Sequence, residues 1–218
     1  MNSLEDELES ARNLQIDELA SAIEEIGFSC TRCGACCRGH GGDDHTATVF
    51  PDEVRDLQDT EEEYDWRDVA RPMPYGLVED AEGDLEGETF EWAIQTDDCG
   101  DCAFYEEDDG VGACQVHDER PLICRTYPFS VGLGGTSQPM GEAVDEEGVV
   151  RAHECEGLGR EITREDAEKL ARALKERAVR ELEEAIAVRN NYEPAARPGE
   201  VVVHDSEGAK REDGTPLE

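Results

Sequence analysis

Four of the nine cysteines fall within eight residues, and their spacing is typical of a metal-binding turn. The pattern is C-x2-C-x2-C-C, formed by Cys30, Cys33, Cys36 and Cys37. Two intervening residues let both thiolates of a C-x2-C turn reach one metal ion, at about 2.3 Å for a Zn–S bond. Gly34 gives the backbone the freedom that such a turn needs. The N-terminal cluster therefore predicts metal ligation.

The first three cysteines also have the C-x2-C-x2-C spacing that holds iron-sulfur clusters in bacterial ferredoxins. The Cys-Pro that follows in ferredoxins is missing, and Cys37 is a direct neighbour of Cys36 instead. Sites rich in thiolates suit both zinc and iron-sulfur clusters. The spacing slightly favours an iron-sulfur cluster, and a zinc site of four thiolates is the near-equal alternative.

The adjacent pair predicts that the N-terminal cluster does not act alone. In an extended backbone Cys36 and Cys37 point to opposite faces, so we expect one of them to serve a different centre or a redox role. Five distal cysteines supply enough ligands for a second four-coordinate site: Cys99, Cys102, Cys114, Cys124 and Cys155. If a distal ligand shares an ion with the cluster, their two sulfurs should lie within about 4 Å of each other.

From Phe28 to about Gly157 the sequence resembles the YkgJ-like cysteine-cluster family, which has the C-x2-C-x2-C-C signature and is associated with zinc or iron chelation. Downstream, Cys102-Ala-Phe104 is similar to the family's C-x-F segment, and RPLICRTYPF to its R-P-x-x-C-R-x-Y-P-F motif. The resemblance implies eight metal ligands: Cys30, Cys33, Cys36, Cys37, Cys102, Cys114, Cys124 and Cys155. Weaker candidates are the additional Cys99, His117 where a tyrosine is commoner, and His153 near Cys155.

The RPLICRTYPF segment places two prolines and two arginines around Cys124. Pro121 and Pro128 fix the backbone on either side of Cys124, which favours a preorganised thiolate. Arg120 and Arg125 are exceptional cations in an acidic chain, and near a thiolate centre they would offset negative charge and donate hydrogen bonds to sulfur. A surface salt bridge is the alternative role for each arginine.

A second, weaker resemblance is to the cysteine-rich part of flagellin lysine-N-methylases, which implies an iron-sulfur centre. The chain lacks a glycine-rich S-adenosylmethionine loop after a strand, so methyl transfer does not follow from the motif. No G-x-S-x-G occurs, and no catalytic residue is assigned. The sequence thus predicts a metal-binding protein. The alternatives are an iron-sulfur oxidoreductase or methyltransferase-like enzyme, and a thiol redox sensor built on Cys36 and Cys37.

The charge balance disfavours several classes of partner. Asp and Glu total 56 residues against 20 Lys and Arg, a formal net charge of -36. Nucleic acids and anionic membranes are disfavoured, because their phosphates would meet a surface of the same sign. Lysine occurs only at Lys169, Lys175 and Lys210, a composition similar to that of haloarchaeal proteins. Molar salt would screen the self-repulsion of such a halophilic protein.

The N-terminal decapeptide MNSLEDELES has no apolar segment of a secretory signal, and the longest purely aliphatic run is Ala185 to Val188. We therefore expect a cytoplasmic protein, in which cysteines serve metals rather than disulfides.

The periodicity of apolar residues predicts an α+β fold: a small, irregular, metal-tied domain with short strands, braced by terminal helices. We expect a helical arm at 1–28, with one helix or two joined near Asp17, and the cysteine-cluster domain at 29–160. An amphipathic helix at 161–193 follows, opened by a capping box at Thr163. The polar tail, 194–218, should fray, with VVVHD as an edge strand. The acidic stretch 59–88 should be loop, with one turn near Trp66.

Overall fold

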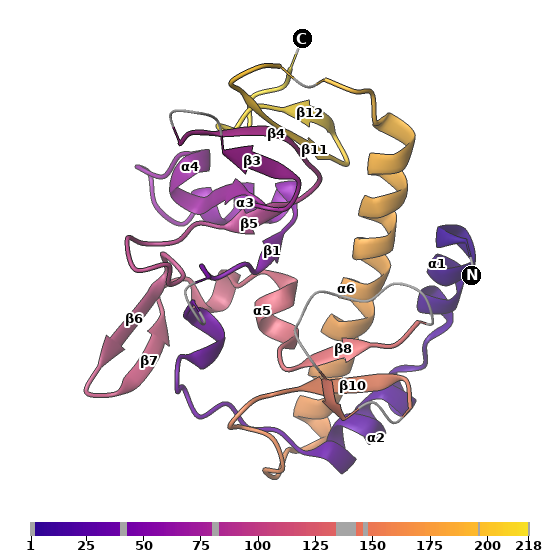
Figure 1. Cartoon of the computed structure of the whole chain (residues 1–218). Coiled ribbons are helices and arrows are strands. Elements are labelled where there is room, and N and C mark those ends of the chain that lie inside the picture. The colour runs from indigo at the N-terminus through magenta and orange to yellow at the C-terminus, as the bar shows by residue number, and fades with distance from the viewer. Residues whose placement is uncertain are drawn as a thin grey trace. The chain divides into compact units, whose positions relative to one another are not determined.

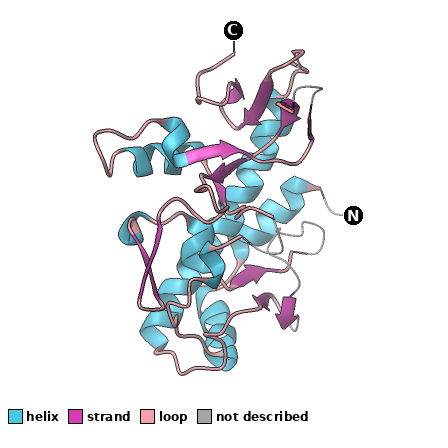
Figure 2. Cartoon of the chain, turned by 60° about the vertical axis from the view of Figure 1, so that its left-hand side comes forward, coloured by secondary structure: helices cyan, strands magenta, loops and turns pink. Residues whose placement is uncertain are grey.

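The computed structural model describes residues 3–39, 43–79, 83–133, 143–145, 148–195 and 197–217. Helices and short strands both occur in it, with helices near the termini, and the predicted α+β class is confirmed (Figure 1, Figure 2). The helices are α1 (Leu4–Asn13), α2 (Ile16–Ile26), α3 (Pro51–Gln58), α4 (Trp66–Val69), α5 (Leu122–Thr126) and α6 (Arg164–Asn191), with 3₁₀ turns η1 (Ala35–Cys37) and η2 (His117–Glu119). The strands are β1 (Thr48–Val49), β2 (Ala70–Pro72), β3 (Leu77–Glu79), β4 (Leu85–Thr89), β5 (Trp92–Ile94), β6 (Tyr105–Asp108), β7 (Val111–Cys114), β8 (Phe129–Val131), β9 (Ala143–Asp145), β10 (Val150–His153), β11 (Val201–Asp205) and β12 (Gly208–Lys210).

The chain divides into two compact units, which we describe separately. Unit 1 comprises Met1–Cys36, Glu107–Gly112 and Leu122–Glu183, and unit 2 comprises Cys37–Glu106, Ala113–Pro121 and Glu184–Glu218. The described strands of the chain form four small sheets, in the orders β1-β5-β2, β8-β10-β9, β12-β11-β4-β3 and β6-β7.

Unit 1 is built on helices α1, α2 and the first part of α6, with the antiparallel sheet β8-β10-β9 beside them (Figure 1). The N-terminal region forms two helices rather than one, separated at Leu14 and Gln15. The apolar faces of α2 and α6 are buried, including Leu19, Ile23 and Leu174, which are fully inaccessible to solvent. Burial of these apolar side chains is the main stabilising contribution in the unit.

Helix α6 begins where the sequence predicts. The amide of Asp166 donates to the Thr163 hydroxyl at 3.1 Å, and that hydroxyl donates to the Asp166 carboxylate at 2.7 Å. The buried cation on this helix was not predicted. Arg177 is only 1% exposed, and its guanidinium donates to Glu181 at 2.6 Å and to the Thr126 hydroxyl at 3.0 Å. These polar partners let a charged residue occupy the apolar stripe.

Unit 2 contains a mixed sheet in which β11 runs parallel to β4 and antiparallel to β12. The prediction of a fraying edge strand at VVVHD is wrong, because β11 is an inner strand and all five of its residues are buried. Asp205 at its end accepts hydrogen bonds from the Trp92 indole at 2.8 Å and from Lys210 at 2.8 Å. Burial on both faces and paired charges therefore hold this segment in place.

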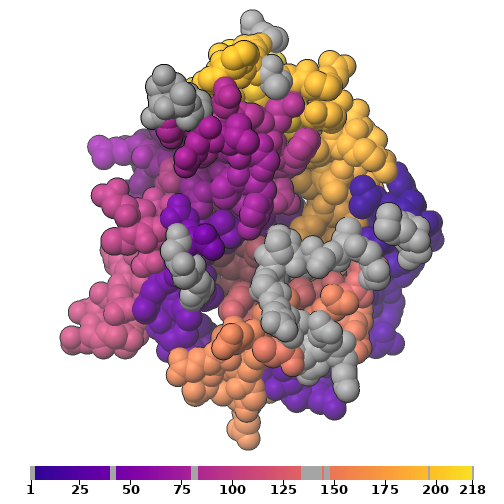
Figure 3. Space-filling view, viewed as in Figure 1, coloured from indigo at the N-terminus to yellow at the C-terminus, as the bar shows by residue number. Residues whose placement is uncertain are grey.

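The turn predicted near Trp66 is present as α4, but the rest of the prediction of a loop over 59–88 is wrong. The segment also contains β2, β3 and most of β4, and β3 pairs with β4 through Leu77↔Gly87 and Glu79↔Leu85. The acidic residues of these segments suggested a loop, but most residues of β3 and β4 are exposed or half-buried, which tolerates charge. The magenta surface in Figure 3 includes both strands. Val78 and Leu85 lie exposed on the same hairpin. No helix in the described part of the chain is both long and apolar enough to cross a membrane.

Candidate metal centre

The N-terminal cluster forms a tight turn that leads into η1. Arg32 and Gly34 have positive φ angles of 58° and 74°, so both residues lie in the left-handed region of backbone conformation. Glycine takes this conformation without steric cost, which explains Gly34. The predicted extended backbone at Cys36 and Cys37 is wrong, because both residues belong to the 3₁₀ turn that follows Gly34.

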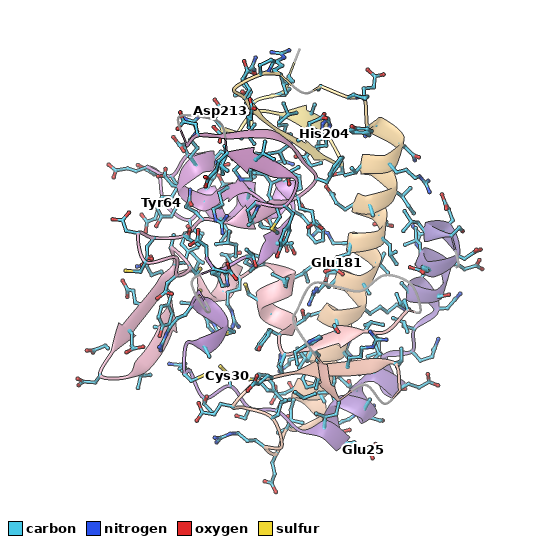
Figure 4. The ribbon with its side chains drawn as sticks, in the orientation of Figure 1. Glu25, Cys30, Tyr64, Glu181, His204 and Asp213 are labelled. Atoms are coloured by element: carbon cyan, nitrogen blue, oxygen red, sulfur yellow. The ribbon has the colours of Figure 1, made fainter. Side chains whose placement is uncertain are left out.

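The cluster is joined to the far end of the cysteine-rich region by backbone pairing. The Ser29 amide donates to the Gly157 carbonyl at 3.0 Å, and the Gly159 amide donates to the Gly27 carbonyl at 3.0 Å. Phe28 and Leu158 form an antiparallel bridge between these two hydrogen bonds. This pairing brings the segment that carries Cys155 beside the segment that enters the cluster at Cys30, the cysteine labelled in Figure 4.

Gly157 makes this close approach sterically feasible. A Cβ atom at this position would lie 2.6 Å from the Ser29 carbonyl oxygen and 2.9 Å from the Phe28 ring. Such distances require the backbone itself to move. In the sequence Gly157 marked only the end of the family resemblance, because a glycine's packing partner is invisible without the fold.

Three cysteines of the cluster affect the pKa of Cys155. Burial raises the pKa of the Cys155 thiol, and the negative charges of Cys36, Cys33 and Cys30 raise this pKa further. The Gly157 amide opposes this shift, because it donates to the Cys155 sulfur at 3.4 Å and favours the thiolate. The structure thus brings one distal cysteine of unit 1 to the N-terminal cluster.

Tyr127, in the RPLICRTYPF segment, is bonded to the segment that carries Cys155. Its hydroxyl donates to the carbonyl of Glu154, the residue before Cys155. Burial raises the pKa of Tyr127 to about 12, and the charges of Cys155 and Cys36 contribute to the increase. No role for this tyrosine was predicted from the sequence, although its place in the family motif was the available signal.

A second group of cysteines lies in unit 2. The Cys102 amide donates to the Cys37 carbonyl at 2.8 Å, and Cys102 is buried with 7% of its surface exposed. Cys114 is the last residue of β7, and the amide of Gln115 donates to the Phe104 carbonyl at 2.9 Å. Cys99 is exposed on the turn before Cys102, and its amide donates a hydrogen bond to the Asp97 carboxylate at 2.8 Å.

The remaining candidates take separate positions. Cys124 is half-buried on α5, and Arg125 follows it on the same helix. His153 is buried on β10, where its Nε2 lies 2.8 Å from the Ser130 hydroxyl oxygen. His117 is exposed in η2, with its Nδ1 3.2 Å from Asp118, and its carbonyl accepts from the Arg120 guanidinium at 3.0 Å. That Arg120 and Arg125 offset the charge of a thiolate centre stays a prediction.

The sulfur donors of the cysteines suit a thiophilic metal. All nine cysteines lie in described segments and are thiols rather than disulfides. Among the described residues, no three Cys, His, Asp or Glu side chains are placed to hold a metal ion together.

Comparison with family models decides what the cysteine pattern means. The model named CxxCxxCC, described as "Putative zinc- or iron-chelating domain", matches residues 29–156. The chain belongs to this family. The predicted resemblance to the YkgJ-like cysteine-cluster proteins is therefore confirmed, and the CxxCxxCC domain occupies more than half of the chain. Searches of curated proteins and of solved structures returned no match. The resemblance to flagellin lysine-N-methylases stays a prediction.

Proposed function

We propose that this CxxCxxCC protein holds a zinc or iron centre through the thiolates of Cys30, Cys33, Cys36 and Cys155. The observation that carries the proposal is the backbone pairing of Ser29 with Gly157, which brings the segment of Cys155 beside the segment that enters the cluster within unit 1. The pKa of Cys155, raised by burial and then by the charges of Cys36, Cys33 and Cys30, supports the same grouping.

Four sulfur donors restrict the metal to a narrow class. Soft thiolate ligands select zinc, copper(I) and iron-sulfur clusters over magnesium, calcium and manganese, which prefer oxygen. The ferredoxin-like spacing of Cys30, Cys33 and Cys36 favours an iron-sulfur cluster over a single zinc ion. When bound, either centre would supply positive charge that stabilises the four thiolates.

The raised pKa of Cys155 is consistent with ligation and not with a freely reactive thiol. A reactive thiol needs a low pKa, because the thiolate is the reactive species. Burial, and then the negative charges of Cys36, Cys33 and Cys30, instead raise the pKa of Cys155. The redox-sensor alternative, which rests on Cys36 and Cys37, stays a prediction. A bound cation would reverse this effect, since it favours the charged form and releases the proton.

The decisive experiment is purification of the full chain without oxygen, followed by a visible spectrum and metal analysis. An iron-sulfur cluster absorbs in the visible, and zinc does not. Cys33→Ser and Cys155→Ser should each lose the metal of this centre and part of the cooperative unfolding transition, because metal-binding energy contributes to folding. Ser29→Ala is the matched control: it changes an exposed neighbour and preserves the backbone bond to Gly157. Unchanged metal content and melting in Cys155→Ser would refute the proposed ligand set.

A further inference from the structure

The two adjacent cysteines of the signature have different surroundings. Both lie in η1, a 3₁₀ turn with three residues per turn, so their side chains leave the backbone in directions roughly 120° apart. Cys36 belongs to unit 1, as does Cys155, whereas the carbonyl of Cys37 accepts a hydrogen bond from the amide of Cys102 within unit 2. The boundary between unit 1 and unit 2 falls between Cys36 and Cys37.

The segment that begins at Cys37 is fixed on the loop that carries Cys102. In addition to the bond between Cys37 and Cys102, the Gly39 amide donates to the Asp101 carboxylate at 3.0 Å. The amide of Asp97 donates to the Asp101 carbonyl at 2.8 Å and closes the loop. Cys37 therefore has a defined backbone position next to a C-x2-C turn, the local geometry that lets thiolates converge on one ion.

Cys114 approaches the same loop from β7. The amide of Tyr105 donates to the Cys102 carbonyl at 2.9 Å, which makes Cys102 the first residue of a tight turn. The amide of Gln115, next to Cys114, bonds to Phe104 in the middle of this turn at 2.9 Å. Three cysteines far apart in sequence are thus held on neighbouring backbone segments within unit 2.

We propose that the adjacent residues Cys36 and Cys37 bind two different thiolate centres, one in each unit. Cys36 serves the first centre with Cys30, Cys33 and Cys155, and three ligands of the second centre are Cys37, Cys102 and Cys114. The second centre takes a thiophilic cation of the zinc and iron class, because its donors are sulfurs of a partly buried site. The first half of this division rests on the proposed function, and the second half stands on the contacts of unit 2.

A cobalt titration of the reduced, metal-free full chain tests the division. Co²⁺ bound by thiolates gains sulfur-to-metal charge-transfer absorption, and the absorption should rise until two equivalents per chain are bound. Cys36→Ser and Cys37→Ser form a matched pair of neighbouring, chemically identical changes, and each should lose one equivalent. The double variants Cys36→Ser/Cys155→Ser and Cys37→Ser/Cys102→Ser should still bind one equivalent, whereas Cys36→Ser/Cys102→Ser should bind none.

The double variants separate this inference from the proposed function. A single equivalent that every one of these substitutions abolishes would overturn the division and indicate one shared centre. If Cys37→Ser still binds two equivalents of Co²⁺, Cys37 is not a ligand of the second centre. If Cys155→Ser keeps both equivalents while Cys37→Ser loses one, the proposed first ligand set is wrong and the second centre stands.

Alkylation of the unmodified protein keeps the test independent of variant folding. The chain is loaded with increasing Co²⁺, treated briefly with iodoacetamide, and mapped by mass spectrometry. Cys30, Cys36 and Cys155 should become protected in proportion to one another, and Cys37 in proportion to Cys102 and Cys114. The proposal of two centres is contradicted if Cys36 and Cys37 become protected from alkylation with the same dependence on Co²⁺ and the titration ends at one equivalent per chain.

Discussion

The amide of Ser29 and the carbonyl of Gly157, 3.0 Å apart, join the two ends of the cysteine-rich domain. The family match begins at residue 29 and ends at 156, so this hydrogen bond closes almost the entire domain into a loop. Closing a long loop costs conformational entropy, which local contacts alone do not offset. A metal held by Cys155 and the N-terminal cluster would stabilise the same closure.

Replacing Gly157 should damage the centre without removing a ligand. In Gly157→Ala the new Cβ would lie 2.6 Å from the Ser29 carbonyl oxygen, so the two backbone segments must separate. We expect a lower melting temperature and at least about tenfold weaker metal binding, equivalent to about 1.4 kcal/mol. The measurements are thermal unfolding and competition with a chelator.

Gly159→Ala is the control for that substitution. Gly159 has a φ of 74°, but no atom lies within 4 Å of the place that a Cβ would occupy, so alanine there introduces backbone strain without a clash. It should cost about 1 kcal/mol of stability. Equal metal affinity in the Gly157 and Gly159 variants would show that the close approach does not position the centre.

The metal-free protein should lose stability in alkali partly through Tyr127. Its pKa is raised from 10.0 to about 12 in the folded state, chiefly by burial and then by the neighbouring Cys155. The folded state therefore retains a proton that the unfolded state releases, and stability falls as pH rises between these values. Tyr127→Phe should flatten this fall. An identical dependence of unfolding on pH in both proteins, between pH 10 and 12, would argue against a buried phenol.

The acidic composition predicts stabilisation by salt. At a net charge of -36, self-repulsion opposes the compact state, and 1 M KCl shortens the screening length to about 3 Å. The melting temperature of the full chain should rise steadily with KCl, up to molar concentration. A melting temperature independent of KCl would mean that local contacts, rather than general repulsion, determine the effect of the carboxylates.

The buried Arg177 should contribute far more to stability than an exposed arginine on the same helix. Its guanidinium is 1% exposed and bonded to Glu181 and Thr126, so Arg177→Met would leave buried polar partners unsatisfied. We expect a loss of about 3 to 5 kcal/mol in the free energy of unfolding. Arg172→Met breaks an exposed pair with Glu168 and should cost less than about 1 kcal/mol. Denaturant unfolding of both variants measures the difference.

Features that depend on short stretches of chain were predicted from the sequence. Thr163 and Asp166 define the start of α6, and Gly34 defines a turn with positive φ, because both depend on neighbouring residues alone. The position of β11 was not predictable in this way. VVVHD forms a strand by its own propensity, but only pairing with β4 and β12 makes it an inner, fully buried strand.

The candidate centre likewise has features that depend on short stretches of chain and features that depend on distant segments. By itself the sequence determined the kind of donor, the spacing of the N-terminal cluster and the family, because thiolate chemistry and a C-x2-C turn are local properties. Only the tertiary structure decided that the segment of Cys155 pairs with the segment that enters the cluster, while Cys37 pairs its backbone with Cys102. That choice depends on backbone contacts between segments distant in sequence, such as Ser29 with Gly157, and their free energy comes from packing that no spacing of cysteines encodes.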